Sequence, residues 1–285
     1  MQKRYGVVLS LIISICCIAG KYGFAATVGN PLDIDIPERS AILREQAVDE
    51  TLNTYEQTLK IKASFDAEFM FNKELHTTSE VTDAELKGKW YMAKLGITIL
   101  NRVEPYIKIG TSDLETQWKQ GCIEMEVEAD TGLAFGGGLK AKIWEFEDLG
   151  IRLTGDFQYR TTEPDPDKIT VNGINVVDTG ATFKVDEWQV SLLASKKFEI
   201  PLKWQSIYVV PYTGVTYSDS TVDVDFKNTV YTGLKSSLYE ANNNDLYGFV
   251  LGFDIVPSLT GAFIYSLELR LIAETALSLG GTMKF

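Results

Sequence analysis

The stretch LKIKASFDAEFMF, Leu59 to Phe71, alternates between apolar and polar side chains. This period of two residues is typical of a β-strand. The stretch is also as long as the roughly 9 to 11 residues that a tilted strand needs to cross a bilayer. The polar face carries four charges, Lys60, Lys62, Asp66 and Glu68. A packed core would not accept them, so this face should meet water, while the apolar face should meet lipid or another sheet.

The same alternation recurs along the rest of the chain. It is strong at 151–160, 247–255 and 263–271, weaker at 91–99, 107–110, 133–143, 188–194 and 207–217, and it returns in the terminal stretch 277–285. After residue 26 no apolar run is long enough for a transmembrane helix. The sequence therefore predicts an all-β fold over residues 57–285, a transmembrane antiparallel up-and-down β-barrel of about ten strands. Twelve is the alternative if 122–127 or 168–177 also spans.

Connection lengths support the same layout. Tight turns are expected at 101–102, 147–148, 200–201 and 257–258, and long polar links at 76–87, 112–130, 161–182 and 218–245. Short periplasmic turns that alternate with long external loops are typical of outer-membrane barrels. Aromatic girdles are expected from Trp144, Phe146 and Trp204 at the periplasmic edge and from Tyr159, Trp188, Tyr217 and Tyr247 at the external edge. The alternative is that these are core aromatics of a β-sandwich.

The first residues predict export. Lys3 and Arg4 precede an apolar run at 7–18, and small residues surround Ala25 and Ala26, which is the layout of a signal peptide over residues 1–26. An uncleaved anchor and a lipoprotein are the alternatives. Cleavage would remove three of the 27 basic residues and none of the 39 acidic ones, so the formal charge would fall from −12 to −15. Such a surface argues against nucleic acid as a partner.

Residues 27–56 differ from the barrel pattern. Apolar residues at helical spacing within 37–55 predict a short helix, placed in the periplasm or tucked into the lumen. Only Cys122 would survive processing, so no internal disulfide is expected.

No group of residues predicts an enzyme or a cofactor. His76 is the single histidine and is expected in an exposed link. The acids Glu163, Asp165 and Asp167 lack the glycine and the terminal acid of a calcium loop, so no metal is expected. Glycines 136–138 lack the lysine that a phosphate loop requires. Asn172-Gly173 predicts a two-residue hairpin turn inside one external loop.

The inward face of the predicted strands carries charges of both signs. The expected pore-lining residues are Lys60, Lys62, Asp66, Glu68, Lys108, Lys140, Lys142, Arg152, Asp156, Arg160, Glu268 and Arg270. Such residues set ion preference in a water-filled pore, which predicts porin-like passive diffusion of ions or small hydrophilic solutes. In so narrow a barrel, however, opposite charges could pair and shut the lumen. The alternative is therefore a non-conducting structural or adhesive barrel.

Several stretches resemble the chlamydial major outer membrane protein family, which are porins. They are TVGNP at 27–31, FDAEFMFNKEL at 65–75, IWEFEDLGIRLTGDFQY at 143–159, DEWQVSLLASKKF at 186–198, PYTGVTYSDSTVDVD at 211–225 and YSLELRLIAETALSLGGTMKF at 265–285. The resemblance implies a bacterial outer-membrane location, surrounding lipid and a homotrimer. It also implies that Phe285 is the signal read by the barrel-assembly machinery. This chain is shorter than typical members and lacks most of their cysteines, which puts disulfide cross-linking in doubt.

Overall fold

The computed structural model describes residues 59–77, 81–176, 180–202, 206–226, 238–257 and 263–285. The expected signal peptide, the expected N-terminal helix and Trp204 lie outside these ranges. None of the described residues forms a helix long and apolar enough to cross a bilayer.

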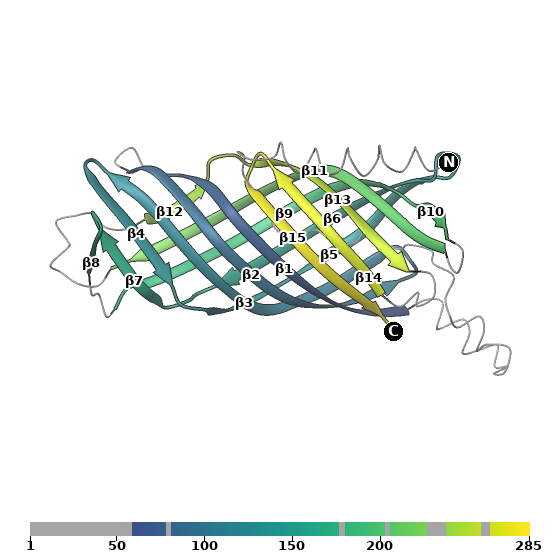
Figure 1. Cartoon of the computed structure of the whole chain (residues 1–285), viewed down its shortest axis with the longest axis horizontal. Coiled ribbons are helices and arrows are strands. Elements are labelled where there is room, and N and C mark those ends of the chain that lie inside the picture. The colour runs from purple at the N-terminus through teal and green to yellow at the C-terminus, as the bar shows by residue number, and fades with distance from the viewer. Residues whose placement is uncertain (1–58, 78–80, 177–179, 203–205, 227–237, 258–262) are drawn as a thin grey trace.

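Ten antiparallel strands form a closed barrel (Figure 1). They are β1 (Leu59–His76), β2 (Val81–Ile99), β3 (Val103–Gln120), β5 (Gly132–Phe146), β6 (Ile151–Thr162), β9 (Thr182–Lys196), β11 (Ser206–Asp225), β13 (Tyr247–Pro257), β14 (Phe263–Leu271) and β15 (Thr275–Lys284). Each pairs with the next, and β15 closes the circle against β1, with Ser64 opposite Thr282. This confirms the ten predicted strands. The alternative of twelve is wrong, because the segments near 122–127 and 168–177 lie outside this circle.

The alternation decides which side chains point outward. Phe65 and Phe157 are 53% and 49% exposed on the outer wall, whereas Lys62 and Asp156 are 4% and 3% exposed in the interior. Closure satisfies the backbone of every strand in the circle, so an apolar outer wall can lie in hydrocarbon. The prediction that alternate side chains face lipid and lumen is confirmed.

Aromatic side chains mark both edges of the apolar wall. The rings of Trp188 and Tyr217 are 5.4 Å apart, and those of Tyr217 and Tyr247 are 5.2 Å apart. Trp144 and Phe146 lie 6.5 Å apart near the opposite edge. An even-stranded closed barrel with an apolar band between aromatic girdles is the architecture of bacterial outer-membrane proteins. The protein is an outer-membrane β-barrel.

Beyond the external girdle the alternation inverts. In β2, Ala93 and Leu95 face outward within the apolar band. Nearer the external end of the same strand, which is its start, Lys89 faces outward while Trp90 and Leu86 are buried inside. The reason is that water replaces lipid outside the membrane, so the polar face turns out and the apolar face turns in. Strands β1, β2, β3, β9 and β11 all continue into this region, which we call the external extension.

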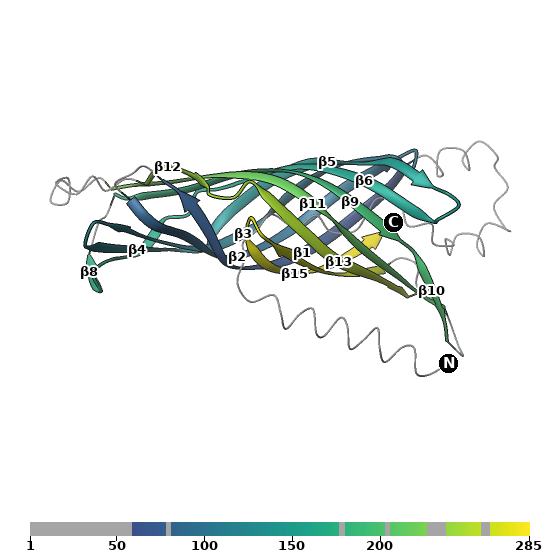
Figure 2. The ribbon, with the colours of Figure 1, turned by 90° about the horizontal axis from the view of Figure 1, so that it is seen from above.

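Four further strands complete the external extension. They are β4 (Ile123–Ala129), β7 (Pro166–Val171), β8 (Ile174–Val176) and β12 (Leu238–Asn243). Figure 2 shows β4, β8 and β12 at that end of the molecule. Over the parts of the four long polar links that the structure describes, the prediction of loops is therefore wrong for most residues. Those segments looked loop-like because their outward residues are charged, although they continue or add strands.

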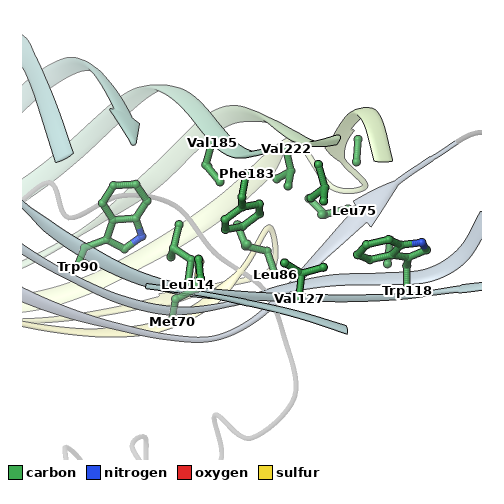
Figure 3. Close-up of a cluster of buried hydrophobic side chains, with 14 of the residues drawn as sticks. Met70, Leu75, Leu86, Trp90, Leu114, Trp118, Val127, Phe183, Val185 and Val222 are labelled. Atoms are coloured by element: carbon green, nitrogen blue, oxygen red, sulfur yellow. The ribbon is translucent and has the colours of Figure 1, made fainter. Parts of the chain in front are cut away.

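The external extension has an apolar interior (Figure 3). Phe183 and Val185 are fully buried, and Leu86 and Leu114 are 1% exposed. Its outer wall instead carries ion pairs such as Lys119 with Asp83, at 3.2 Å. A hydrophobic core under a charged surface is the arrangement of a water-soluble β-protein, built here on top of a membrane barrel.

Two local features depend on backbone conformation. Asn172 and Gly173 both have positive φ, 49° and 77°, and join β7 to β8, so the predicted hairpin turn is confirmed. At the other end of the molecule β10 (Phe198–Pro201) pairs with β11, so the tight turn expected at 200–201 is wrong: both residues belong to a strand.

Candidate functional site: an ionic column inside the barrel

Charged side chains fill the interior of the membrane-spanning region. Among the described residues, seven cationic and eight acidic side chains are buried. The cations are Lys62, Lys73, Lys94, Lys108, Lys140, Arg160 and Arg270, and the acids are Asp66, Glu68, Glu104, Asp156, Glu187, Asp254, Glu268 and Glu274. We call this set the ionic column. Its nearly balanced charge allows pairing throughout.

At the external end of the ionic column, six charges join in a closed ring of alternating sign. In order around the ring they are Arg160, Glu68, Arg270, Glu274, Lys73 and Glu187. The nitrogen-to-oxygen distances are 3.0, 3.2, 3.7, 3.1, 3.2 and 3.1 Å in the same order. Strands β1, β6, β9 and β14 and the β14–β15 turn supply these residues. This ionic ring therefore ties separate parts of the wall together across the lumen.

Arg160 makes the most contacts in the ionic ring. Its two terminal nitrogens donate to Glu68 at 3.1 and 3.0 Å, and Nη2 also donates to Glu187. The guanidinium lies 4.1 Å from the centre of the Trp90 ring, within cation–π range. Planar guanidinium geometry suits such two-point pairing, which a lysine would not reproduce.

Lys73 reaches the ionic ring because of a β-bulge. The register of β1 shifts between Met70 and Lys73, so the inward residues change from even to odd numbers. Without this extra residue the Lys73 side chain would face outward. The bulge thus places a cation opposite Glu187 and Glu274.

Below the ionic ring, polar contacts continue toward the periplasm. Tyr106 donates to Asp156 at 3.0 Å, and Lys94 lies 5.2 Å from the Tyr106 ring centre. Further down, Lys62 donates to Glu104 at 2.6 Å. The polar interior is therefore continuous from the periplasmic mouth to the ionic ring.

The interior is closed in this structure. Lys140, Gln189, Asp254 and Glu274 are all 0% exposed. A water-filled channel would leave surface on the side chains that line it. Side chains therefore fill the lumen, as expected for a barrel only slightly wider than eight strands.

The structure places all twelve predicted pore-lining residues on the inner face. Nine of them are buried, and Lys60, Lys142 and Arg152 are half-buried near the periplasmic mouth. Arg152 and Lys142 share Glu145 there, at 2.7 and 3.1 Å. The role of these residues in lining an open pore stays a prediction.

Sequence reasoning missed several members of the ionic column. Lys94 lies within the alternating segment predicted at 91–99, on its inward face, and extending the alternation at 188–194 by one residue would have found Glu187. No local signal would have found Lys73, which depends on the bulge, or Glu274, which lies in a turn.

Other residues singled out in the sequence lie away from the ionic column. His76 is exposed at the external end of β1, and Cys122 is exposed in the β3–β4 turn. Glu163 and Asp165 line a surface pocket beside β5, and in the part of the chain that the structure describes no three potential ligands are grouped to hold a metal ion.

The comparisons with known proteins add the following. No family model and no curated protein matches the chain. Among solved structures, it is similar to the translocator domain of the autotransporter NalP from Neisseria meningitidis, with 10% identity and a TM-score of 0.41, covering 86% of this chain and 93% of that one. It is also similar to the outer membrane protein OprG from Pseudomonas aeruginosa, with 8% identity, a TM-score of 0.35, and coverage of 80% and 96%. The third similar structure is the transport unit of the autotransporter AIDA-I from Escherichia coli, with 8% identity, a TM-score of 0.36, and coverage of 84% of this chain and 92% of that one.

Proposed function

We propose that this barrel passes ions or small hydrophilic solutes across the outer membrane, and that the ionic ring holds the path closed in the state described here. The passage is passive and uses no cofactor. The ionic ring would open when its members exchange partners with water or with a passing ion.

The observation that carries this proposal is the ionic column itself. Burying charges is costly even when they are paired, and apolar residues of similar size often give equal or greater stability. This chain does fill part of its own interior with apolar side chains, around Phe183 in the external extension. Ionisable residues at membrane depth commonly mark ion pathways. The charges between the girdles therefore favour conduction as their role.

The second candidate is a non-conducting barrel that presents the external extension at the cell surface. Two observations favour it: the buried state of Lys140 and Glu274, and the well-packed apolar core of the external extension. The two candidates differ in whether disrupting the ionic ring releases a current.

Single-channel recording in planar bilayers tests the proposal. We expect the wild-type barrel to be closed most of the time, with brief small steps. Arg160→Gln removes the guanidinium that pairs with Glu68 and Glu187, so we expect the open fraction to rise by about tenfold or more, since breaking a buried pair destabilises the closed state.

The matched control is Lys89→Gln, which makes the same change in net charge on the outer wall. Lys89 and its partner Asp113 are both about half-exposed, so we expect no change in current. If neither the wild type nor Arg160→Gln gives current steps after insertion into the bilayer, the proposal is refuted and the non-conducting candidate is favoured.

The resemblance to the chlamydial porin family belongs to the same proposal, as do the homotrimer and the reading of Phe285 by assembly machinery. In support of the last, Phe285 is held by a backbone hydrogen bond from its N–H to the carbonyl of Ile61, at 3.0 Å, beside the β1–β15 closure.

A further inference from the structure

The wall of the barrel is uneven at its external end. Strands β13, β14 and β15 end near the girdle, whereas β1 and β11 continue outward. Above these three strands, β12 fills the space between β11 and β1, with Ala241 opposite Val222 and Asn243 opposite Leu75 (Figure 1). On this side of the barrel, the interior just outside the ionic ring is therefore bordered by β12 and not by β13, β14 or β15.

Polar residues lie where β12 gives way to the ends of β13, β14 and β15: Asn72 is opposite Thr275 at the start of β15, and Asn243 at the end of β12 is opposite Leu75. We call them the polar seam: Asn72, Ser218, Ser220 and Asn243. The Asn243 amide donates to the Ser218 carbonyl at 3.0 Å. The polar seam joins the ionic ring directly, because the ammonium of Lys73 donates to Ser220 Oγ and also pairs with Glu274.

Outward of the polar seam the interior is apolar on every side, because Val222 of β11 and Ala241 of β12 belong to the same buried cluster as the residues of the opposite wall. Phe183 of β9, Leu86 of β2 and Leu114 of β3 pack together there (Figure 3). An ion leaving the ionic ring through this core would lose its hydration without gaining polar partners, which is costly. The polar seam offers hydroxyl and amide groups instead.

The polar seam and the adjoining Glu274 of the ionic ring contain buried oxygens that accept no hydrogen bond. Within the described residues, Asn72 Oδ1, Asn243 Oδ1 and both carboxylate oxygens of Glu274 accept no hydrogen bond, although Glu274 is ion-paired. Such atoms are stabilised when water reaches them. Water that enters at the polar seam would supply hydrogen-bond donors to such oxygens.

We propose that the ion path leaves the barrel sideways through the polar seam, beneath β12, and does not run through the apolar core of the external extension. The inference rests on the proposed function for the ions, whereas water access at the polar seam can be measured independently. The external extension would then lie beside the exit and take no part in the ion path.

Thiol labelling in a Cys122→Ser background tests this inference. Asn243→Cys and Ser220→Cys place a thiol in the polar seam, and Leu114→Cys places one in the apolar core. The folded protein in vesicles is exposed to a membrane-impermeant cationic methanethiosulfonate, and labelling is followed by mass spectrometry. Ser220, Asn243 and Leu114 are 1%, 5% and 1% exposed, so each thiol needs a local opening to react. Because water gains polar partners at the polar seam and none in the apolar core, we expect the seam thiols to react at least about tenfold faster than the core thiol.

The same reagent, added to the external side of a planar bilayer that contains Arg160→Gln, tests the ion path. We expect a several-fold loss of current with Asn243→Cys and no change with Leu114→Cys. Equal or faster labelling at Leu114→Cys would overturn the sideways exit. Fast seam labelling without any current would refute the proposed conduction and leave water access at the polar seam established.

Discussion

Removing Arg160 from the ionic ring should destabilise the barrel strongly. Arg160→Met loses the two-point contact with Glu68 at 3.1 and 3.0 Å, the contact with Glu187 at 3.1 Å and the cation–π contact with Trp90. It leaves two buried carboxylates facing each other. Breaking a buried pair in this way costs about 3–5 kcal/mol, and the Trp90 contact adds to this, so we expect a loss of about 4 kcal/mol or more.

Removing Arg160 together with Glu187 should cost much less. In Arg160→Met/Glu187→Met the remaining ring members, Glu68, Arg270, Glu274 and Lys73, form an open chain with two charges of each sign. Apolar replacement of a whole buried pair is often neutral. We therefore expect the free energy of unfolding of the double variant to fall by only about 1 kcal/mol, much less than that of either single variant.

Equilibrium urea unfolding in lipid vesicles, followed by tryptophan fluorescence, measures these free energies of unfolding. Arg152→Met is the control, because its pair with Glu145 is only partly buried, with side chains 13% and 36% exposed; we expect its loss to cost about 1 kcal/mol, the upper end for solvent-exposed pairs. A double variant whose loss equals the sum of the two single losses, or an Arg160→Met loss no larger than that of Arg152→Met, would refute the reasoning.

Three further predictions concern the external extension. Phe183→Ala should leave a cavity in its core and destabilise it by about 3–5 kcal/mol, seen as faster amide exchange there with unchanged exchange between the girdles. Gly88 has a φ of +149°, and a Cβ there would lie 2.2 Å from the Asp113 carbonyl oxygen, so Gly88→Ala should cost about 1–3 kcal/mol in urea unfolding; no loss would contradict this contact. Burial, helped by Glu126, raises the pKa of Glu115 above its ordinary value, so the fold is favoured at low pH and loses this contribution as the pH rises. Glu126→Gln should therefore stabilise the protein near neutral pH but not below about pH 4, and an equal gain at both pH values in urea titrations would count against it.

The sequence was sufficient for the membrane-spanning part of the fold because one physical rule operates along every strand there. Lipid outside and polar groups inside give a period of two, as at Phe65 and Asp66, and ten such segments were found. The same rule explains why the predicted pore-lining residues all lie on the inner face.

The external extension escaped prediction because its alternation has the opposite sense. Leu86 and Leu114 point inward while Lys87 and Asp113 point outward, so the segments resembled polar loops. A search for alternation of either sense would have recovered these strands. The ionic ring could not be assembled from sequence, because it joins four strands and a turn across the lumen and depends on the bulge that turns Lys73 inward.

The measurement that tests the central claim most directly is a spin-label scan of β1 in bilayers, with single cysteines at residues 61–69 in a Cys122→Ser background. Collision rates with oxygen report contact with lipid, and those with a water-soluble nickel complex report contact with water. The structure predicts high oxygen accessibility at Ile61, Phe65 and Phe69 and low accessibility to both reagents at Ser64 and Asp66. A flat profile, or oxygen accessibility that peaks at Ser64 and Asp66, would contradict a lipid-facing wall around a closed ionic interior.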